Sequence, residues 1–133
     1  MKKRKEPVEV LELIRPDCIW RRCPAEFATE AERKKRKDTS TAIVFLEQLY
    51  PFPEAEVATE FDRHGKSNDI VWVQEEPANM GAMFNMLPRL KRIAGERPVL
   101  SVKRSSSPSP ATGSAKAHEV EQKTLLTLAF TTK

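Results

Sequence analysis

Three short runs of apolar, β-branched residues constrain the fold of this 133-residue chain more than any other feature. They are TAIVFL at 41–46, DIVWVQ at 69–74 and PVLSVK at 98–103. Runs of this length and composition predict β-strands. Because each run is apolar almost throughout instead of alternating with polar residues, both faces of each strand should be covered, as in a parallel sheet.

Segments with helical periodicity separate and follow these runs, and they span 53–65, 79–95 and 115–130. The first two end at a glycine, which is a helix stop signal. Pro88, inside the second segment, predicts a kink or the start of a second helix. Alternating strands and helices joined by right-handed crossovers predict a three-layer α/β fold, a mainly parallel sheet with helices on both faces.

The front of the chain carries the charge surplus. Residues 1–40 hold 12 Lys and Arg against 8 Asp and Glu, whereas residues 41–133 hold 11 against 11, which together give the net charge of +4. The larger part of the chain therefore does not favour nucleic-acid binding. Within the front, VEVLELI at 8–14 is compatible with a short strand and EFATEAERKKRKD at 26–38 with a polar helix.

Other sequence features exclude two classes of protein. No apolar run approaches the roughly 20 residues of a membrane-spanning helix, and residues 1–20 do not form a secretory signal, so we expect a cytoplasmic protein without a membrane partner. Cys18 and Cys23 are close in sequence, but His64 and His118 are distant from them and from each other. A zinc site needs about four ligands, so we expect reduced thiols and no metal site.

The stretch VWVQEEPANMGA places two acids directly after a buried strand. Because neighbouring residues of a strand point to opposite faces, Glu75 and Glu76 are not expected to act together on one bond. The structural interpretation is that Gln74, Glu75 and Asn79 hydrogen-bond loop amides while Pro77 ends the strand. The functional interpretation is that this edge faces neighbouring domains or a subunit and lines the approach to their active site.

A second candidate site follows the last strand. Arg104 and the serine-rich loop 105–109, which includes Ser107, precede the helix that should begin near Ser114. A guanidinium beside a helix N-terminus favours an anion, although serine-rich loops are common without any ligand. His118, one turn into that helix, is expected to be a surface or interface histidine and not a base.

Three blocks of the sequence carry a resemblance to a known family. FLEQLYPFPEAEV at 45–57, VWVQEEPANMGA at 71–82 and SPSPATGSAKAHEVEQ at 107–122 resemble, in order and spacing, the C-terminal domain of 2-oxoglutarate dehydrogenase, thiamine-diphosphate-dependent first component. The resemblance covers about residues 32–130. The resemblance implies a domain at 32–133 that is similar to the C-terminal domain of transketolase. This domain follows a basic segment at 1–31 that is not matched.

The resemblance also implies that the catalytic and cofactor-binding residues lie outside this chain. In this superfamily thiamine diphosphate and magnesium lie between two other domains, so we expect no catalytic, cofactor-binding or metal-binding residue in this chain. The chain has four glycines and no Gly-Asp-Gly diphosphate motif. The family's early strand, with its Ser-Gly-Lys turn, and most of the following helix are expected to be missing or replaced. Phe45, Met83 and the Lys103–Ser105 stretch also differ from the family pattern, which puts contacts with those domains in doubt.

These observations leave several functions open. The first hypothesis is a detached C-terminal domain from an interrupted gene, with a structural role and no activity alone. Its parent would decarboxylate 2-oxoglutarate, or a close homologue such as 2-oxoadipate, and transfer the succinyl group to a lipoyl arm in the tricarboxylic acid cycle. Its partners would be the remaining domains or subunit of that dehydrogenase. The alternatives are a stand-alone regulatory or assembly subunit of a 2-oxo acid dehydrogenase complex, or a small basic nucleic-acid-binding protein.

Overall fold

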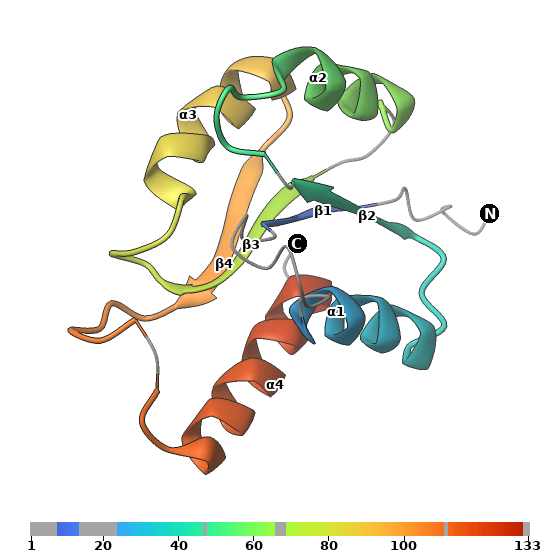
Figure 1. Cartoon of the computed structure of the whole chain (residues 1–133). Helices are drawn as coiled ribbons and strands as arrows, with labels where there is room; N and C mark the ends of the chain where they lie inside the picture. The colour runs from blue at the N-terminus through green and yellow to red at the C-terminus, as the bar shows by residue number, and fades with distance from the viewer. Residues whose placement is uncertain (1–7, 14–23, 47, 66–68, 111, 132–133) are drawn as a thin grey trace.

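A computed structural model describes residues 8–13, 24–46, 48–65, 69–110 and 112–131. Strands and helices alternate along the chain, as Figure 1 shows. In chain order the elements are β1 (Val8–Leu13), α1 (Pro24–Lys35), β2 (Thr41–Leu46), α2 (Glu54–Arg63), β3 (Ile70–Pro77), α3 (Met83–Ala94), β4 (Val99–Arg104) and α4 (Ala115–Thr131). No helix among the described residues is both long and apolar enough to cross a membrane.

The four strands form one parallel sheet with the order β2-β1-β3-β4. The first strand therefore lies inside the sheet, where Val8 pairs with Thr41 of β2 and Glu9 with Ile70 of β3. This is the position in which we expected a missing or replaced strand, and residues 8–13 occupy it. The helix that follows, α1, is also present.

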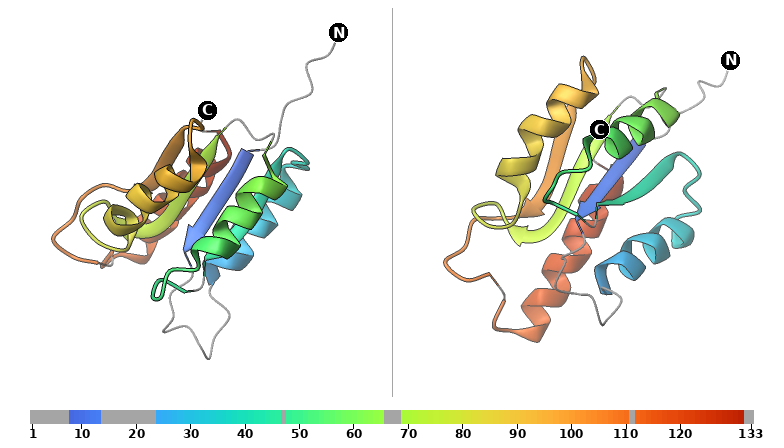
Figure 2. Two further views of the ribbon diagram at one scale, coloured as in Figure 1. Left: turned by 90° about the horizontal axis from the view of Figure 1, so that it is seen from above. Right: turned by 45° about the horizontal axis from the view of Figure 1, so that its top comes forward.

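Helices cover both faces of the sheet, as the two views in Figure 2 show. Because side chains alternate along β3, Ile70 and Trp72 pack toward α2 and α3, whereas Val71 and Val73 pack toward α4. Trp72 is fully buried. The near-continuous apolarity of this strand thus results from burial on both faces, and the three-layer α/β prediction is confirmed.

Most predicted element boundaries lie within a few residues of the observed ones. β2 has the predicted bounds, and β3 ends at Pro77 as expected. The alternative of a second helix beginning at Pro88 is wrong, because α3 is assigned as one helix through that residue. Met86 and Leu90 of α3 are fully buried, and this packing holds the helix together across the proline.

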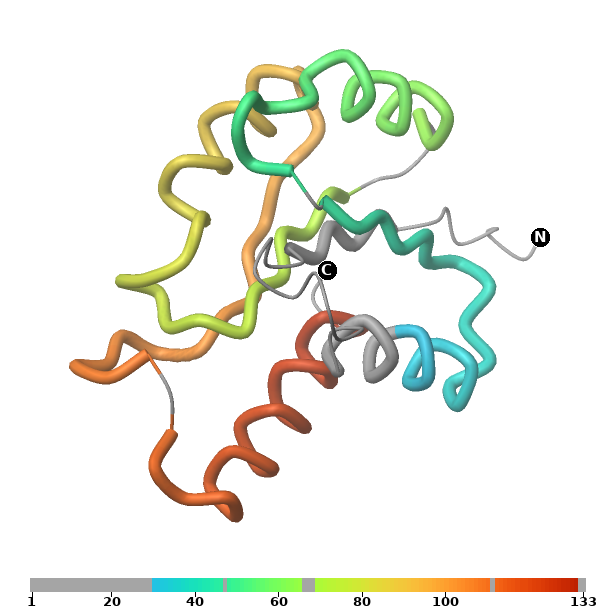
Figure 3. The backbone as a smooth tube through the Cα atoms, viewed as in Figure 1, coloured from blue at the N-terminus to red at the C-terminus, as the bar shows by residue number. Residues whose placement is uncertain are grey.

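An irregularity near the end of β3 positions the candidate site. The pairing of β3 with β4 is regular up to Val73, shifts between Val73 and Pro77, and resumes with Pro77 opposite Arg104. A bulge of this kind bends a strand and redirects its side chains. Figure 3 shows the chain leaving this bend, turning back into α3, and passing beside the loop that follows β4.

Candidate functional site

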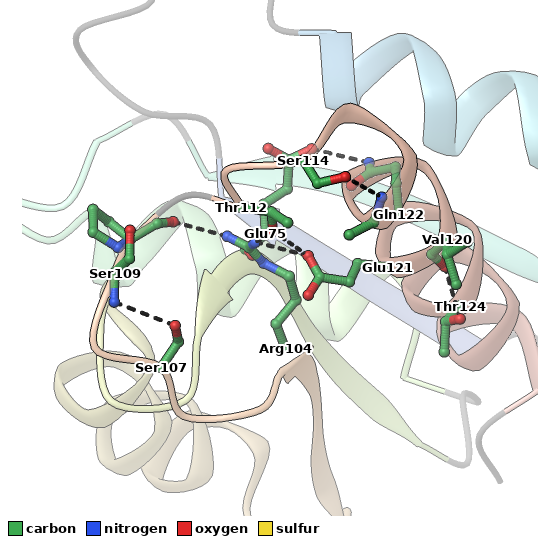
Figure 4. Close-up of polar contacts among 12 residues, drawn as sticks. Glu75, Arg104, Ser107, Ser109, Thr112, Ser114, Val120, Glu121, Gln122 and Thr124 are labelled. Atoms are coloured by element: carbon green, nitrogen blue, oxygen red, sulfur yellow. Dashed lines mark hydrogen bonds and ion pairs between the residues drawn. The ribbon is translucent and has the colours of Figure 1, made fainter.

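Polar side chains gather where β3 and β4 end, at the carboxyl edge of the sheet. They come from the bulged end of β3, the turn at 78–82, the loop at 105–114 and the first turns of α4 (Figure 4). We call this group the carboxyl-edge cluster. Its members are Gln74, Glu75, Glu76, Asn79, Arg104, Ser107, Thr112, Ser114, His118, Glu121 and Gln122.

Gln74 organises the turn between β3 and α3. Its Oε1 accepts hydrogen bonds from the indole Nε1 of Trp72 and the backbone amide of Met83, both at 3.1 Å. Its Nε2 donates to the carbonyl oxygens of Glu76 and Pro77 at 3.2 Å and of Met80 at 2.9 Å. The side chain is fully buried, so these bonds replace its contacts with water. The prediction that Gln74 binds loop amides is confirmed at Met83.

Gly81 lets this turn pass close to the strand. Its φ is +72°, in the region that favours glycine. A Cβ at this position would lie 3.0 Å from Cβ of Glu76 and 3.1 Å from the side-chain amide of Gln74. The turn therefore needs glycine for both its backbone conformation and its space.

Asn79 joins the turn to the loop after β4. Its Nδ2 donates to the carbonyl of Ser107, and its Oδ1 accepts from the amide of the same residue, both at 3.0 Å. The Ser107 hydroxyl in turn accepts from the amide of Ser109 at 3.2 Å. The predicted bond from Asn79 to a loop amide is confirmed, and it fixes the two loops side by side.

Arg104 is enclosed by acceptors of the chain itself. Its Nε donates to the carbonyl of Glu75, and Nη2 donates to the carbonyl of Pro110 at 2.9 Å. Its Nη1 donates to Oγ1 of Thr112 at 2.9 Å and to Oε2 of Glu121 at 3.1 Å. In Figure 4 the guanidinium lies among these groups. The anion site suggested around Arg104 stays a prediction. In the observed geometry, Arg104 acts as a clamp, since it joins the loop at 105–114 to β3 and α4.

The carboxylate that faces Arg104 has a lowered pKa. A hydrogen bond from the Thr112 hydroxyl is the largest cause of the lower pKa of Glu121, followed by the bond from Arg104. Glu121 therefore stays ionised to a lower pH than an ordinary glutamate does. The negative charge completes the clamp, since Arg104 is mostly buried and needs a charged partner.

Glu75 and Glu76 point to different sides of the sheet. Oε1 of Glu75 accepts a hydrogen bond of 2.9 Å from Nε2 of Gln122 on α4. Glu76 is buried on the side of Gln74 and Gly81. The expectation that the two side chains point to opposite faces is confirmed. The expectation that Glu75 binds a loop amide is wrong, because its side chain faces α4, as those of Val71 and Val73 do, and binds the side-chain amide of Gln122.

The two remaining predicted residues lie at the start of α4. The Ser114 hydroxyl accepts a long bond of 3.4 Å from the amide of Ala117, and its carbonyl accepts from the amide of His118 at 2.9 Å. Ser114 thus occupies an N-cap position. The His118 side chain is exposed, in agreement with the expectation of a surface histidine.

The cluster does not have the composition of a cofactor site. Among the described residues, no group of three or more His, Cys, Asp or Glu side chains converges where a metal ion could bind. The strongest cation, Arg104, already has four acceptors. The side chains at this edge therefore do not fit a magnesium-bound diphosphate. Cys18 and Cys23, for which we expected no metal site, lie outside the described residues.

Three members of the cluster were not predicted, namely Thr112, Glu121 and Gln122. Each is an ordinary polar residue near the start of a helix. Its role depends on a partner from β3 or β4 that only the folded chain brings near. The helical period of α4 did predict that Glu121 and Gln122 belong to one turn, but it did not predict which face meets the sheet.

Comparison with known proteins identifies a family and relatives to which the chain is similar. The profile of the family described as "2-oxoglutarate dehydrogenase C-terminal" matches residues 26–130. The 2-oxoglutarate dehydrogenase E1 component of Cupriavidus necator is 40% identical over 99 residues, which are 74% of this chain and 10% of that protein. The corresponding component of Shouchella clausii is 37% identical over 116 residues, which are 84% of this chain and 12% of that protein.

The chain therefore spans about a tenth of the length of the curated relatives it matches. Among solved structures, "Split gene transketolase, inactive beta4 tetramer" superposes with a TM-score of 0.55 at 12% identity. The superposition covers 96% of this chain and 39% of that one. At this identity the likeness concerns the fold, and it agrees with the transketolase-like architecture expected from the sequence.

Proposed function

The chain belongs to the 2-oxoglutarate dehydrogenase C-terminal family, and from this premise we propose that it is a non-catalytic interface domain of a 2-oxoglutarate dehydrogenase. In that enzyme, thiamine diphosphate and magnesium would be held by other domains. The carboxyl-edge cluster would contact those domains and support the approach to their active site. Parallel α/β sheets commonly use this edge for such contacts.

The observation that carries the proposal is a pair of exposed aromatic residues at the same edge. Tyr50, in the loop after β2, is 91% exposed, and Phe84, in the first turn of α3, is 69% exposed. Aromatic residues are enriched in the cores of protein interfaces because they bury a large apolar area. The loop that carries Tyr50 and the helix that carries Phe84 are both held in place by contacts with the hydrophobic core. Phe52 packs on the core, and the Arg89 guanidinium lies 5.4 Å from the centre of its ring.

The cluster itself supports an interface more than a reaction. Its polar side chains are satisfied by groups of the chain itself, since Gln74 makes five hydrogen bonds and Arg104 makes four. A network of this kind fixes the shape of the turn at 78–82 and of the loop at 105–114. A fixed shape lowers the entropy cost of docking on another domain.

An assay of the purified chain tests the catalytic part of the proposal. With 2-oxoglutarate, thiamine diphosphate and magnesium, release of carbon dioxide should equal that of a buffer control. Titration calorimetry should show no uptake of thiamine diphosphate. Turnover above the control that depends on added thiamine diphosphate would show that the chain is catalytic and would overturn the proposal.

A binding experiment tests the interface part. A Cupriavidus necator E1 component that lacks its own C-terminal segment should bind the chain. Replacing Tyr50 and Phe84 by serine should weaken that binding by about tenfold or more, because each aromatic residue buries a large apolar area. Leu128→Ser is the matched control, since Leu128 is 45% exposed near the end of α4, away from the first turns of that helix, which belong to the carboxyl-edge cluster. Equal affinity of all three proteins would contradict the interface.

A further inference from the structure

The outer side of β2 is an open sheet edge. Within the described part of the chain, β2 pairs with β1 on one side and with no strand on the other. Every second backbone amide and carbonyl of an edge strand points outward, where it can accept the ladder of another strand. β2 therefore presents a row of hydrogen-bonding groups along 41–46.

A groove runs beside this edge. It has a volume of about 440 Å³ and is lined by Val44, Phe45 and Leu46 of β2 together with Pro53 and Val57 at the start of α2. Figure 1 shows α2 on the side of the sheet where this groove lies, opposite α1 and α4. The apolar lining and the size suit one or more large side chains of an extended segment.

Two acidic residues border the groove. Glu56 and Glu60 are four positions apart on α2, so they lie on the same helix face. Glu60 is paired with Arg63 at 2.6 Å. Among the described residues, Glu56 has no ion-pair partner. Like charges at this spacing destabilise a helix slightly, and a cation placed beside them offsets the cost. The charge of the border therefore favours a basic occupant.

We propose that the outer edge of β2 binds an extended polypeptide segment as a fifth strand of the sheet. Backbone hydrogen bonds to β2 hold the segment, an apolar side chain fills the groove, and a Lys or Arg side chain lies beside Glu56 and Glu60. This surface is separate from the carboxyl-edge cluster. The proposal therefore does not depend on the interface function proposed above.

A labelled synthetic peptide that alternates valine and lysine is the probe. Fluorescence anisotropy should show that the full chain binds it, and amide hydrogen exchange should slow at residues 42–46 in the complex. A peptide of the same sequence, N-methylated at alternate amides, keeps the charge but cannot complete the ladder. Its affinity should be lower by about tenfold or more, since each lost hydrogen bond contributes about 1 kcal/mol.

Substitutions in the border test the charge. The double variant Glu56→Gln with Glu60→Gln should bind the valine-lysine peptide more weakly by a factor of about ten at low salt, and the difference should shrink as salt is added. Glu119→Gln is the matched control, because Glu119 is an exposed glutamate on α4. It should bind the peptide as the unaltered chain does. Circular dichroism establishes that each variant is folded.

Three results would overturn the proposal. The first is the absence of peptide binding, and the second is equal affinity for the methylated and unmethylated peptides. The third is slowed exchange at 42–46 without peptide, in step with a dimer seen by sedimentation, which would assign the edge to a second copy of this chain.

Discussion

The side-chain amide of Gln122 donates a hydrogen bond of 2.9 Å to the carboxylate of Glu75 and so joins α4 to the bulged end of β3. The two residues are 47 positions apart in sequence. Both are partly buried, so the bond is shielded from competing water. Since Arg104 also donates to the backbone carbonyl of Glu75, this residue connects two sides of the carboxyl-edge cluster.

Glu75→Ala should lower the free energy of unfolding by about 1–2 kcal/mol, because it removes a hydrogen bond with a charged acceptor. Urea unfolding of the single variants Glu75→Ala and Gln122→Ala and of the double variant gives the coupling between them. The account expects a positive coupling energy. Additive effects of the two substitutions would show that the bond does not stabilise the fold.

Gln74→Leu should be among the most damaging substitutions in the chain. It leaves the Trp72 indole, the Met83 amide and three buried carbonyls without this partner, so we expect a loss of roughly 3–5 kcal/mol. Guanidinium unfolding measures the loss. Gln48→Leu, at an exposed glutamine, should change stability by less than about 1 kcal/mol. Similar losses in both variants would contradict the role given to Gln74.

Gly81→Ala should destabilise the chain by about 1–3 kcal/mol, because alanine is strained at a φ of +72° and its Cβ would press on Glu76 and Gln74. Gly113→Ala is the control, since no atom lies within 4 Å of the added Cβ. Thermal unfolding should show a lower Tm for the Gly81 variant alone. An unchanged Tm for Gly81→Ala would mean that the turn relaxes without cost.

The lowered pKa of Glu121 predicts a specific dependence on pH. A carboxyl whose folded-state pKa lies below its ordinary 4.5 stabilises the fold above that value, and the contribution is lost as the pH falls through the folded-state pKa. The stability difference between the unaltered chain and Glu121→Gln should therefore be constant near neutral pH and should shrink below about pH 4.5. A difference that increases on acidification would contradict the Thr112 and Arg104 contacts as its cause.

The sequence predicted the elements of the fold because their signals are local. β-branched runs predicted β2, β3 and β4, and glycine stops predicted the ends of α2 and α3. The order of the strands has no local signal. That residues 8–13 lie between β2 and β3 depends on contacts between distant segments, and no pattern within VEVLEL gives it.

The candidate site was predictable in part for the same reason. Gln74 and Asn79 were expected to bind loop amides because they stand at a strand end and in a turn, and both do. Glu75 was expected to bind a loop amide, but its partner is Gln122 of α4, 47 positions away, and no local signal beside the strand indicates it. One partner of Arg104, Glu121, comes from a helix that begins more than ten positions later, and only packing of α4 on the sheet brings the two together.

The central claim is that the carboxyl edge of this domain contacts the catalytic domains of a 2-oxoglutarate dehydrogenase. In a chimera, the residues of this chain replace the segment of the Cupriavidus necator E1 component that aligns with it. The chimera is compared with its Tyr50→Ser, Phe84→Ser double variant and with its Leu128→Ser control.

The most direct measurement is the rate of thiamine-diphosphate-dependent decarboxylation of 2-oxoglutarate by these three chimeras, together with their affinity for thiamine diphosphate. We expect the chimera and the Leu128→Ser control to be equally active, whereas the Tyr50→Ser, Phe84→Ser variant should be slower by about tenfold with unchanged cofactor affinity. Equal rates for all three chimeras, or a selective loss of thiamine diphosphate binding in the double variant, would contradict the central claim.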